Sequence, residues 1–199
     1  MDNLKDLLKQ RRSRYSLAAE NSLTNDQLKE LIDYAVTHVP SAFNSQSART
    51  VLLLNDEHRK LWKIVENVLS EVVPAEAFEK TRTKINNCFA CGYGTVLFYE
   101  DQSIIRDLQE NFPTYSDNFP VWSNQSSAMH QYAVWLLLEE AGMGASLQHY
   151  NPLIDSKVAE EWNIDPNWKL IAQMPFGIAI DTPGEKEFHP LETRSLVYR

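Results

Sequence analysis

A long helix without a polar face is the feature that most constrains how this chain can fold. Residues 123–141 are predicted to form it, and the side chains from Ala133 to Leu138 are apolar on nearly every side. Such a helix has to be central in the fold or buried where two subunits meet, because a surface helix needs a polar face toward water. Gly142 follows directly, where a helix commonly ends.

An amphipathic helix, a polar loop and an apolar strand follow one another earlier in the chain. Thr24 and Gln27 form a capping box, and apolar residues then recur at helical spacing until Pro40. The run Val51–Leu54 is short and wholly apolar, as expected of a buried strand. Asp56 is then expected to cap a further amphipathic helix.

The rest of the chain alternates between helices and short strands. We expect a helix at 75–86, a strand at 95–99, a helix capped by Asp101, strands at 145–148 and 168–180 (the latter broken near Pro175 and Gly177), and an extended tail at 181–199. Helices outnumber strands, and there is no repeated β-α-β unit with a G-x-G-x-x-G turn. The sequence therefore predicts an α+β fold with helices around a small sheet, in one domain covering residues 1–199.

The charge and hydropathy of the chain limit its partners. The sequence has 19 basic and 27 acidic side chains and a formal net charge of −8. A general surface for nucleic acid or an anionic membrane is therefore not expected, and a local cluster of basic residues becomes more informative. No run approaches the roughly 18 apolar residues that cross a bilayer, and the first residues contain no apolar signal core. We expect a cytoplasmic protein.

The cysteines and histidines give weak support for metal or nucleophilic chemistry. Cys88 and Cys91 form a C-x-x-C pair, which is compatible with a zinc or a redox role. A structural zinc usually needs four ligands, and a thioredoxin-type pair follows a strand whereas this pair precedes one, so we expect reduced thiols packed near a sheet. His38 and His130 are expected on helix surfaces, and no metal site is predicted.

Residues 11–15, here called the basic loop, are a candidate phosphate site. Arg11, Arg12 and Arg14 surround Ser13, and Tyr15 follows. Guanidinium groups bind phosphate through paired, charge-assisted hydrogen bonds. The alternative is a solvated basic end of a helix. Arg194 lies in a tail that otherwise has little reason to be ordered, and it could return to the same phosphate.

Two further segments could contact a ligand. The polar loop, residues 41–46, offers hydroxyl and amide groups that match a heterocycle edge with alternating donors and acceptors; the alternative is an ordinary turn. The glycine turn, residues 142–149, contains small residues that permit close approach of backbone N–H groups to a ligand. Its alternative is that Gly142 only ends a helix and His149 is a satisfied loop histidine.

Taken in order, Arg11-Arg12-Ser13, the polar loop after Pro40, the glycine turn and Arg194 make the chain similar to the FMN-dependent nitroreductase family. The sequence of these segments most resembles the compact subgroup related to the yeast fatty-acid-repression nitroreductase-like proteins. The resemblance spans essentially the whole chain. It implies an α+β sandwich with a small, mainly antiparallel sheet and an intertwined homodimer. Each of two FMN sites would lie at the subunit interface and be built from both chains.

The resemblance also implies a set of cofactor-binding residues. Those expected at the phosphate and ribityl end are Arg11, Arg12, Ser13 and Arg194, with Lys84 as a neighbour and Tyr15 counted in the same set. Those expected from the partner subunit at the ring edge are Ser41, Asn44 and Gln46, with Phe43 as an apolar neighbour. Those aligned with the turn whose backbone N–H approaches flavin N5 are Leu147, Gln148 and His149.

The expected activity follows from the same resemblance. Flavin N5 would carry the chemistry, so no catalytic side chain is predicted, and Lys84 is the candidate for positive charge near N1 and O2. NAD(P)H would reduce the flavin, leave, and be replaced by a nitroaromatic or a quinone in a ping-pong reaction. One alternative is a flavin-bound regulatory or stress-response protein with incidental reductase activity. A second is a helical interaction domain without a cofactor.

Overall fold

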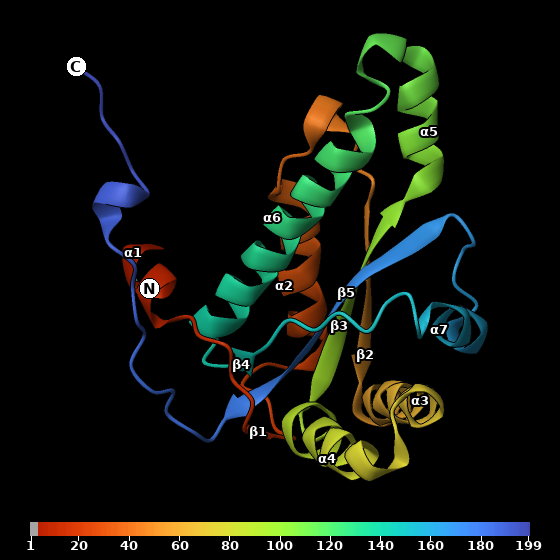
Figure 1. Ribbon diagram of the computed structural model, residues 1–199, viewed down its shortest axis with the longest axis vertical. Coiled ribbons are helices and arrows are strands. Elements are labelled where there is room, and N and C mark those ends of the chain that lie inside the picture. The colour runs from red at the N-terminus through yellow and green to blue at the C-terminus, as the bar shows by residue number, and fades with distance from the viewer. Residues whose placement is uncertain (1–3) are drawn as a thin grey trace.

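The computed structural model describes residues 4–199, in which helices pack on both faces of one five-stranded sheet (Figure 1). The strands are β1 (Leu17–Ala18), β2 (Ala48–Leu54), β3 (Gly94–Asp101), β4 (Gly144–Ala145) and β5 (Trp168–Ala179). Their order is β1-β5-β3-β2, with β4 also paired to β5, and every pair is antiparallel. The predicted α+β fold with a small antiparallel sheet is confirmed.

The helices form two layers, one on each face of the sheet (Figure 1). The α-helices are α1 (Leu4–Gln10), α2 (Asn25–His38), α3 (Asn55–Val72), α4 (Ala75–Ile85), α5 (Gln102–Asn111), α6 (Phe119–Glu140) and α7 (Asp155–Trp162). Short helical turns are η1 (Ala42–Asn44), η2 (Asn86–Ala90), η3 (Pro113–Tyr115) and η4 (Leu191–Thr193). One core lies between the sheet and α2 with α6, and the other lies between the sheet and α3, α4 and α7.

β3 is the central strand, and all eight of its residues are buried. Because successive side chains of a strand point to opposite faces, Val96 and Phe98 enter the core beside α2 and α6, whereas Leu97 and Tyr99 enter the other core. Glu100 is two residues after Phe98, so its side chain points to the same face of the sheet. The strand therefore carries a carboxyl group into the α2 and α6 side of the molecule.

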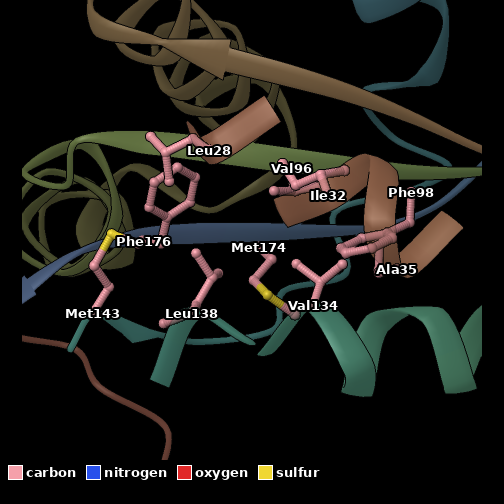
Figure 2. Close-up of a cluster of buried hydrophobic side chains, with 12 residues drawn as sticks. Leu28, Ile32, Ala35, Val96, Phe98, Val134, Leu138, Met143, Met174 and Phe176 are labelled. Carbon is pink, nitrogen blue, oxygen red and sulfur yellow. The ribbon is translucent and has the colours of Figure 1, made fainter. Parts of the chain in front are cut away.

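The core beside α2 and α6 packs both helices against the sheet (Figure 2). Leu28, Ile32 and Ala35 of α2 face the sheet at helical spacing and are almost fully buried. The predicted capping box is present, because Gln27 N–H donates to Thr24 Oγ1 at 3.2 Å and Thr24 N–H donates to Gln27 Oε1 at 2.8 Å.

α6 is central, as its apolar surface predicts, but it differs from the expected helix in two respects. It begins at Phe119 rather than at residue 123, because Pro120 fits the first turn of a helix, where no N–H partner is needed. His130 is 3% exposed rather than on the surface, since this part of α6 is covered by the rest of the chain. Its Nδ1 lies 2.8 Å from the carbonyl oxygen of Ser126.

Two helix starts test the predicted caps with different results. Asp101 caps α5 as expected, accepting a hydrogen bond from Ser103 N–H at 3.0 Å. Asp56 does not cap α3, because β2 passes directly into a helix that begins at Asn55, with Leu54 at the cap position. Asp56 lies instead in the first turn, where a carboxylate favours the helix dipole.

The last two predicted strands also differ from expectation. β5 is continuous through Pro175 and Gly177. Pro175 still accepts a hydrogen bond from Ser146 N–H at 3.3 Å, and Gly177 lets the carbonyl of Ala18 approach so closely that a Cβ would lie 2.4 Å from its oxygen. β4 is limited to two residues, although Gln148 makes an isolated bridge to Gln173 of β5.

The C-terminal tail and the cysteines follow the sequence prediction. Residues 181–199 are extended and largely exposed apart from the short turn η4, and Figure 1 shows them passing α1 and ending away from the sheet. Cys88 and Cys91 are free thiols in and after η2, just before β3. Burial is the main cause that raises the pKa of Cys88, and the neighbouring Cys91 adds to it.

Candidate functional site

The basic loop and the glycine turn lie side by side. Ser13 forms a parallel bridge with Ala145, and Arg14 N–H donates to Ala145 O at 2.9 Å. Gly144 has no room for a side chain, because a Cβ would lie 2.7 Å from the Arg14 side chain. Two segments that are more than a hundred residues apart in the sequence therefore form one surface.

Arg11 of the basic loop packs its guanidinium against aromatic rings of α6. Its guanidinium carbon lies 4.3 Å from the ring centroid of Trp135 and 5.7 Å from that of Tyr132, both on α6. Its Nε is buried without a hydrogen-bond partner in the described chain. Glu139 is half-buried nearby, and its pKa is raised by burial, with Arg14 and Arg11 acting in the opposite direction.

The basic loop also binds the start of the C-terminal tail. Arg12 Nη1 donates to Gly184 O, and Arg14 Nη1 donates to Asp181 O, both at 2.9 Å. Arg194 lies farther along the tail and is exposed. Within one chain, the structure therefore places the beginning of the tail at the basic loop but records no contact of the Arg194 guanidinium with Arg11, Arg12 or Ser13.

The glycine turn is fixed to β5 by its backbone. Gln148 N–H donates to Gln173 O at 2.7 Å, and Gln173 N–H donates to Gln148 O at 2.9 Å. Within residues 4–199, the N–H groups of the neighbouring Leu147 and His149 have no acceptor. The turn thus presents unpaired backbone donors from a rigid support, as expected of a segment that contacts a ligand.

Lys84 and Tyr15 both lie near the ring of Phe89. Lys84 Nζ lies 5.9 Å from the centroid of the Phe89 ring, and the Tyr15 ring lies 6.3 Å from the same ring. Tyr150, directly after the glycine turn, is also 6.3 Å from Phe89. The structure therefore brings Lys84 to the same side of the molecule as the basic loop and the glycine turn.

The polar loop lies at the other end of α6. Phe43 contacts the rings of Phe112 at 5.1 Å, Phe119 at 5.2 Å and Trp122 at 5.9 Å, whereas Arg11 contacts α6 at Trp135. At 1.5 Å per residue, positions 122 and 135 are about 20 Å apart along the helix. One chain therefore does not bring Ser41, Phe43, Asn44 and Gln46 to the other predicted site residues.

The polar loop has an unusual backbone. Phe43, Asn44 and Gln46 all have positive φ angles, of 56°, 50° and 49°, a conformation that L-residues adopt at a cost. Gln46 N–H donates to Ser41 Oγ at 2.9 Å, and Arg49 Nη1 donates to Gln46 O at 2.8 Å. Side-chain hydrogen bonds thus maintain a conformation that the backbone alone disfavours.

The residues that fix the polar loop were not among the predicted site residues. Arg49 Nη2 lies 3.1 Å from Asp101 Oδ2, and Ser47 Oγ donates to Glu100 Oε2 at 2.6 Å. Burial raises the pKa of Glu100 to about 7, although Ser47 and Arg49 act against this change. Burial acts to raise the pKa of Asp101 too, but the hydrogen bonds from Ser103 and the charge of Arg49 lower it. The only sequence signal was the acidic pair that ends an apolar strand.

One cavity lies beside the polar loop, and one apolar groove lies along α6. A cavity of about 320 Å³ is lined by Phe43, Trp122 and Met129 with their neighbours on α6. An apolar groove of about 310 Å³ lies between α1, α2 and α6. Among residues 4–199, no three His, Cys, Asp or Glu side chains are grouped as a metal site requires. No helix in this part of the chain has the length and apolar character to cross a membrane.

Comparison with known proteins places this geometry in a family. A model described as the nitroreductase family matches residues 8–178. Nitroreductase FRM2 of Saccharomyces cerevisiae is 31% identical over 188 residues, which cover 94% of this chain and 93% of that protein. Nitroreductase CinD of Lactococcus lactis, solved in complex with nicotinic acid, is 43% identical with a TM-score of 0.91, covering 99% of this chain and 100% of CinD. CinD has also been solved with chloramphenicol and with 4-nitrophenol.

A more distant protein has the same fold. The FMN-dependent nitroreductase NfnB of Mycobacterium smegmatis, solved in complex with NADPH, is 12% identical with a TM-score of 0.77, covering 98% of this chain and 97% of NfnB. The resemblance inferred from the sequence, including the likeness to the yeast proteins, is thus confirmed by the family model and by relatives that match along nearly the whole chain. The chain belongs to the nitroreductase family.

Proposed function

We propose that the protein is an FMN-dependent oxidoreductase that accepts a hydride from NADH or NADPH and reduces nitroaromatics or quinones, with two active sites formed in a homodimer. The observation that carries this proposal is the separation of the predicted cofactor-binding residues into two groups near opposite ends of α6. In a dimer with a two-fold axis, each group of one chain can meet the other group of its partner. The domain at residues 1–199 would then hold two half-sites.

The group around the basic loop fits the phosphate end of FMN and one edge of its ring. The exposed hydroxyl of Ser13 and the partly exposed side chain of Arg11, whose guanidinium has no carboxylate partner in the described residues, leave donors available for phosphate oxygens. The unpaired N–H groups of Leu147 and His149 leave donors available at the glycine turn. Lys84 adds positive charge on this side. Arg12 and Arg194 would complete the clamp as the tail is ordered by the partner subunit.

The polar loop fits the opposite, polar edge of the flavin ring. Asn44 and Gln46 are exposed, and their carboxamides can both donate and accept. Ser41 is partly committed, since its oxygen accepts from Gln46 N–H. Phe43 is half-exposed and belongs to an aromatic cluster that can receive a flat ring. The chemistry of this donor set matches alternating carbonyl and N–H groups.

An exposed apolar surface supports the dimer. The groove between α1, α2 and α6 is lined by apolar side chains that include Leu7, Val39 and Leu137. Leu4 is 60% exposed and Tyr34 59% exposed at the same place. Monomeric proteins rarely expose contiguous apolar surface of this kind unless another molecule covers it. The tail adds further exposed apolar side chains: Phe188, Leu191, Leu196, Val197 and Tyr198.

The bound FMN would supply a hydride-accepting N5. The chain's own residues would bind its phosphate, orient its ring by backbone donors, and place the charge of Lys84 where negative charge develops. No side chain is required to act as a nucleophile. The aromatic cavity beside Phe43 and Trp122 favours flat acceptors, and the complex of CinD with 4-nitrophenol supports nitroaromatics as one substrate class.

The visible spectrum and the reaction with reduced nicotinamide test this function. Purified protein is expected to be yellow, with absorbance bands near roughly 370 and 450 nm as flavins show. Anaerobic mixing with NADH or NADPH in a stopped-flow instrument should bleach the band at longer wavelength, and 4-nitrophenol or a quinone should restore it. Colourless protein that also rejects added FMN would refute the proposal. Bound FMN that neither nucleotide reduces would favour the regulatory alternative.

A further inference from the structure

A buried carboxyl group lies directly beneath the polar loop. Glu100 is fully buried at the end of β3, opposite Ala48 of β2. Its Oε2 is 2.6 Å from Ser47 Oγ, and its Oε1 is buried without any partner in the described chain. Ser47, itself fully buried, has its Oγ 3.4 Å from Ser45 Oγ. A short chain of hydroxyl groups thus connects the carboxyl group to the polar loop.

The direction of this chain depends on whether Glu100 carries a proton. A carboxylate only accepts hydrogen bonds, so Ser47 donates to it and Ser45 can donate inward to Ser47. A protonated carboxyl group can donate through Oε2 to Ser47, and Ser47 then donates to Ser45. A Ser45 that donates inward offers only lone pairs outward, whereas a Ser45 that accepts from Ser47 has its O–H free to donate outward.

The surroundings of Glu100 favour a change of state near neutral pH. Burial raises its pKa to about 7, with Ser47 and Arg49 lowering it and Asp101 raising it further. Arg49 and Asp101 are paired with each other. Other titratable groups on the adjoining elements are Lys169, the exposed register partner on β5, the buried His130 of α6, whose Nδ1 contacts a backbone carbonyl, Tyr132, Glu139 and Glu140 farther along α6, and Arg106, Asp107 and Glu110 on α5.

We propose that Glu100 is a positioning residue whose protonation sets the direction of the hydrogen bonds through Ser47 and Ser45, and thereby how strongly the polar loop binds the edge of FMN. This inference rests on the proposed function. The flavin edge presents two carbonyl oxygens and one N–H, so a donating Ser45 is the better match. FMN binding is therefore tighter when Glu100 is protonated.

The test is the release of FMN from the purified holoprotein on dilution, followed by flavin fluorescence across the pH range around neutrality. Wild-type protein is expected to bind FMN about fivefold more weakly above the Glu100 transition than below it, as for loss of one hydrogen bond. Glu100→Gln keeps a neutral group that can donate to Ser47, so it should bind tightly throughout. Ser47→Ala breaks the chain, so the step in affinity should vanish although Glu100 still titrates.

A matched control separates this effect from general titration. Asp155 is another half-buried carboxyl whose pKa burial raises, but it begins α7 on the opposite face of the sheet. Asp155→Asn should retain the wild-type pH profile. The FMN phosphate titrates in every variant, so its contribution to the pH profile should be the same in all of them. If Glu100→Gln does not fold, Ser47→Ala provides the same comparison.

The outcomes distinguish the two proposals. Wild-type protein that holds no FMN at any pH refutes the proposed function and this inference with it. FMN binding in which Glu100→Gln or Ser47→Ala keeps the wild-type pH step refutes the inference alone. Loss of the step in Asp155→Asn as well would also refute it, because the effect would then not belong to this chain of hydroxyl groups.

Discussion

The basic loop with the glycine turn and the polar loop are two halves of one expected site, yet they are stabilised in different ways. The glycine turn is fixed by backbone hydrogen bonds to β5, including the pair between Gln148 and Gln173. The polar loop has three residues with positive φ, and the side chains of Arg49, Ser47 and Glu100 support it. The first half depends on the sheet, and the second depends on ionisable side chains.

Because of this difference, the two halves are expected to contribute to FMN binding in different ways. A turn fixed by backbone groups keeps its donors in place over a wide range of conditions, because peptide groups do not titrate. A loop supported by carboxyl and guanidinium groups responds to pH and to single substitutions. We therefore expect the basic loop with the glycine turn, here called the phosphate half, to determine whether FMN binds. The polar loop should modulate how tightly it binds.

The largest expected difference is the pH dependence of stability that comes from Glu100. Its pKa is raised from 4.5 to about 7, so the folded protein keeps a proton that the unfolded chain has released. The free energy of unfolding should therefore fall as pH rises through this window and level off above it, by roughly 3 kcal/mol in total. Urea unfolding at fixed protein concentration should show that Glu100→Gln lacks this decrease and is more stable above the window. Identical pH slopes in the two proteins would contradict the role assigned to burial.

The second test concerns the phosphate half. Arg11→Ala or Arg194→Ala should weaken FMN binding by about 1.5 to 3 kcal/mol for each charged hydrogen bond that is lost. FMN titration of the apoprotein measures the change. Arg82→Ala, which removes only an exposed pair with Glu79, serves as the control and should leave the affinity unchanged. Wild-type affinity in both the Arg11 and the Arg194 variants would show that the phosphate lies elsewhere.

The third test concerns the support of the polar loop. Arg49→Ala removes the partly buried pair with Asp101 and the donor to Gln46 O. It should lower the free energy of unfolding by about 2 kcal/mol, since Asp101 Oδ2 and Gln46 O both lose their donor, while Asp101 Oδ1 keeps its hydrogen bonds from Ser103. Arg59→Ala breaks an exposed pair with Asp56 and should cost at most about 0.5 kcal/mol. Equal costs in denaturant unfolding would mean that the loop needs no such support.

The smallest effect separates folding from binding within the polar loop. Gln46→Gly relieves a positive φ of 49° and should stabilise the fold by about 0.5 kcal/mol while weakening FMN binding through loss of the carboxamide. Asn163→Gly relieves a similar φ of 47° at the end of α7 and should affect stability alone. Thermal unfolding together with FMN titration measures both quantities. A Gln46→Gly protein with undiminished FMN affinity would remove this side chain from the site.

The sequence predicts local structure well where one physical signal dominates. The capping box at Thr24, the cap at Asp101 and the apolar helix α6 were predictable from short-range spacing alone. The start of α3 before Asp56 and the continuity of β5 were not predictable in this way. Both depend on neighbouring strands, through the junction of β2 with α3 and through the close approach at Gly177.

The candidate site shows the same limit. Residue types and their order identified the family, because each loop carries its own donors. The roles of Glu100 and Ser47 depend on a contact between residues 53 positions apart, which no local pattern contains. His130 was assigned to the surface for a similar reason, since its burial depends on packing of the rest of the chain against α6.

The central claim, that each FMN site needs the basic loop of one chain and the polar loop of its partner, has one direct test. Arg11→Ala and Asn44→Ala chains, each carrying a different affinity tag, are co-expressed, and the mixed dimers are isolated and assayed for bound FMN and for NADH-dependent reduction of 4-nitrophenol. In a shared site, one site of the mixed dimer receives both defects and the other neither, so about half of the wild-type FMN content and activity should return. If each chain binds FMN by itself, every site keeps one defect, and the mixed dimer will be no better than the two variants alone.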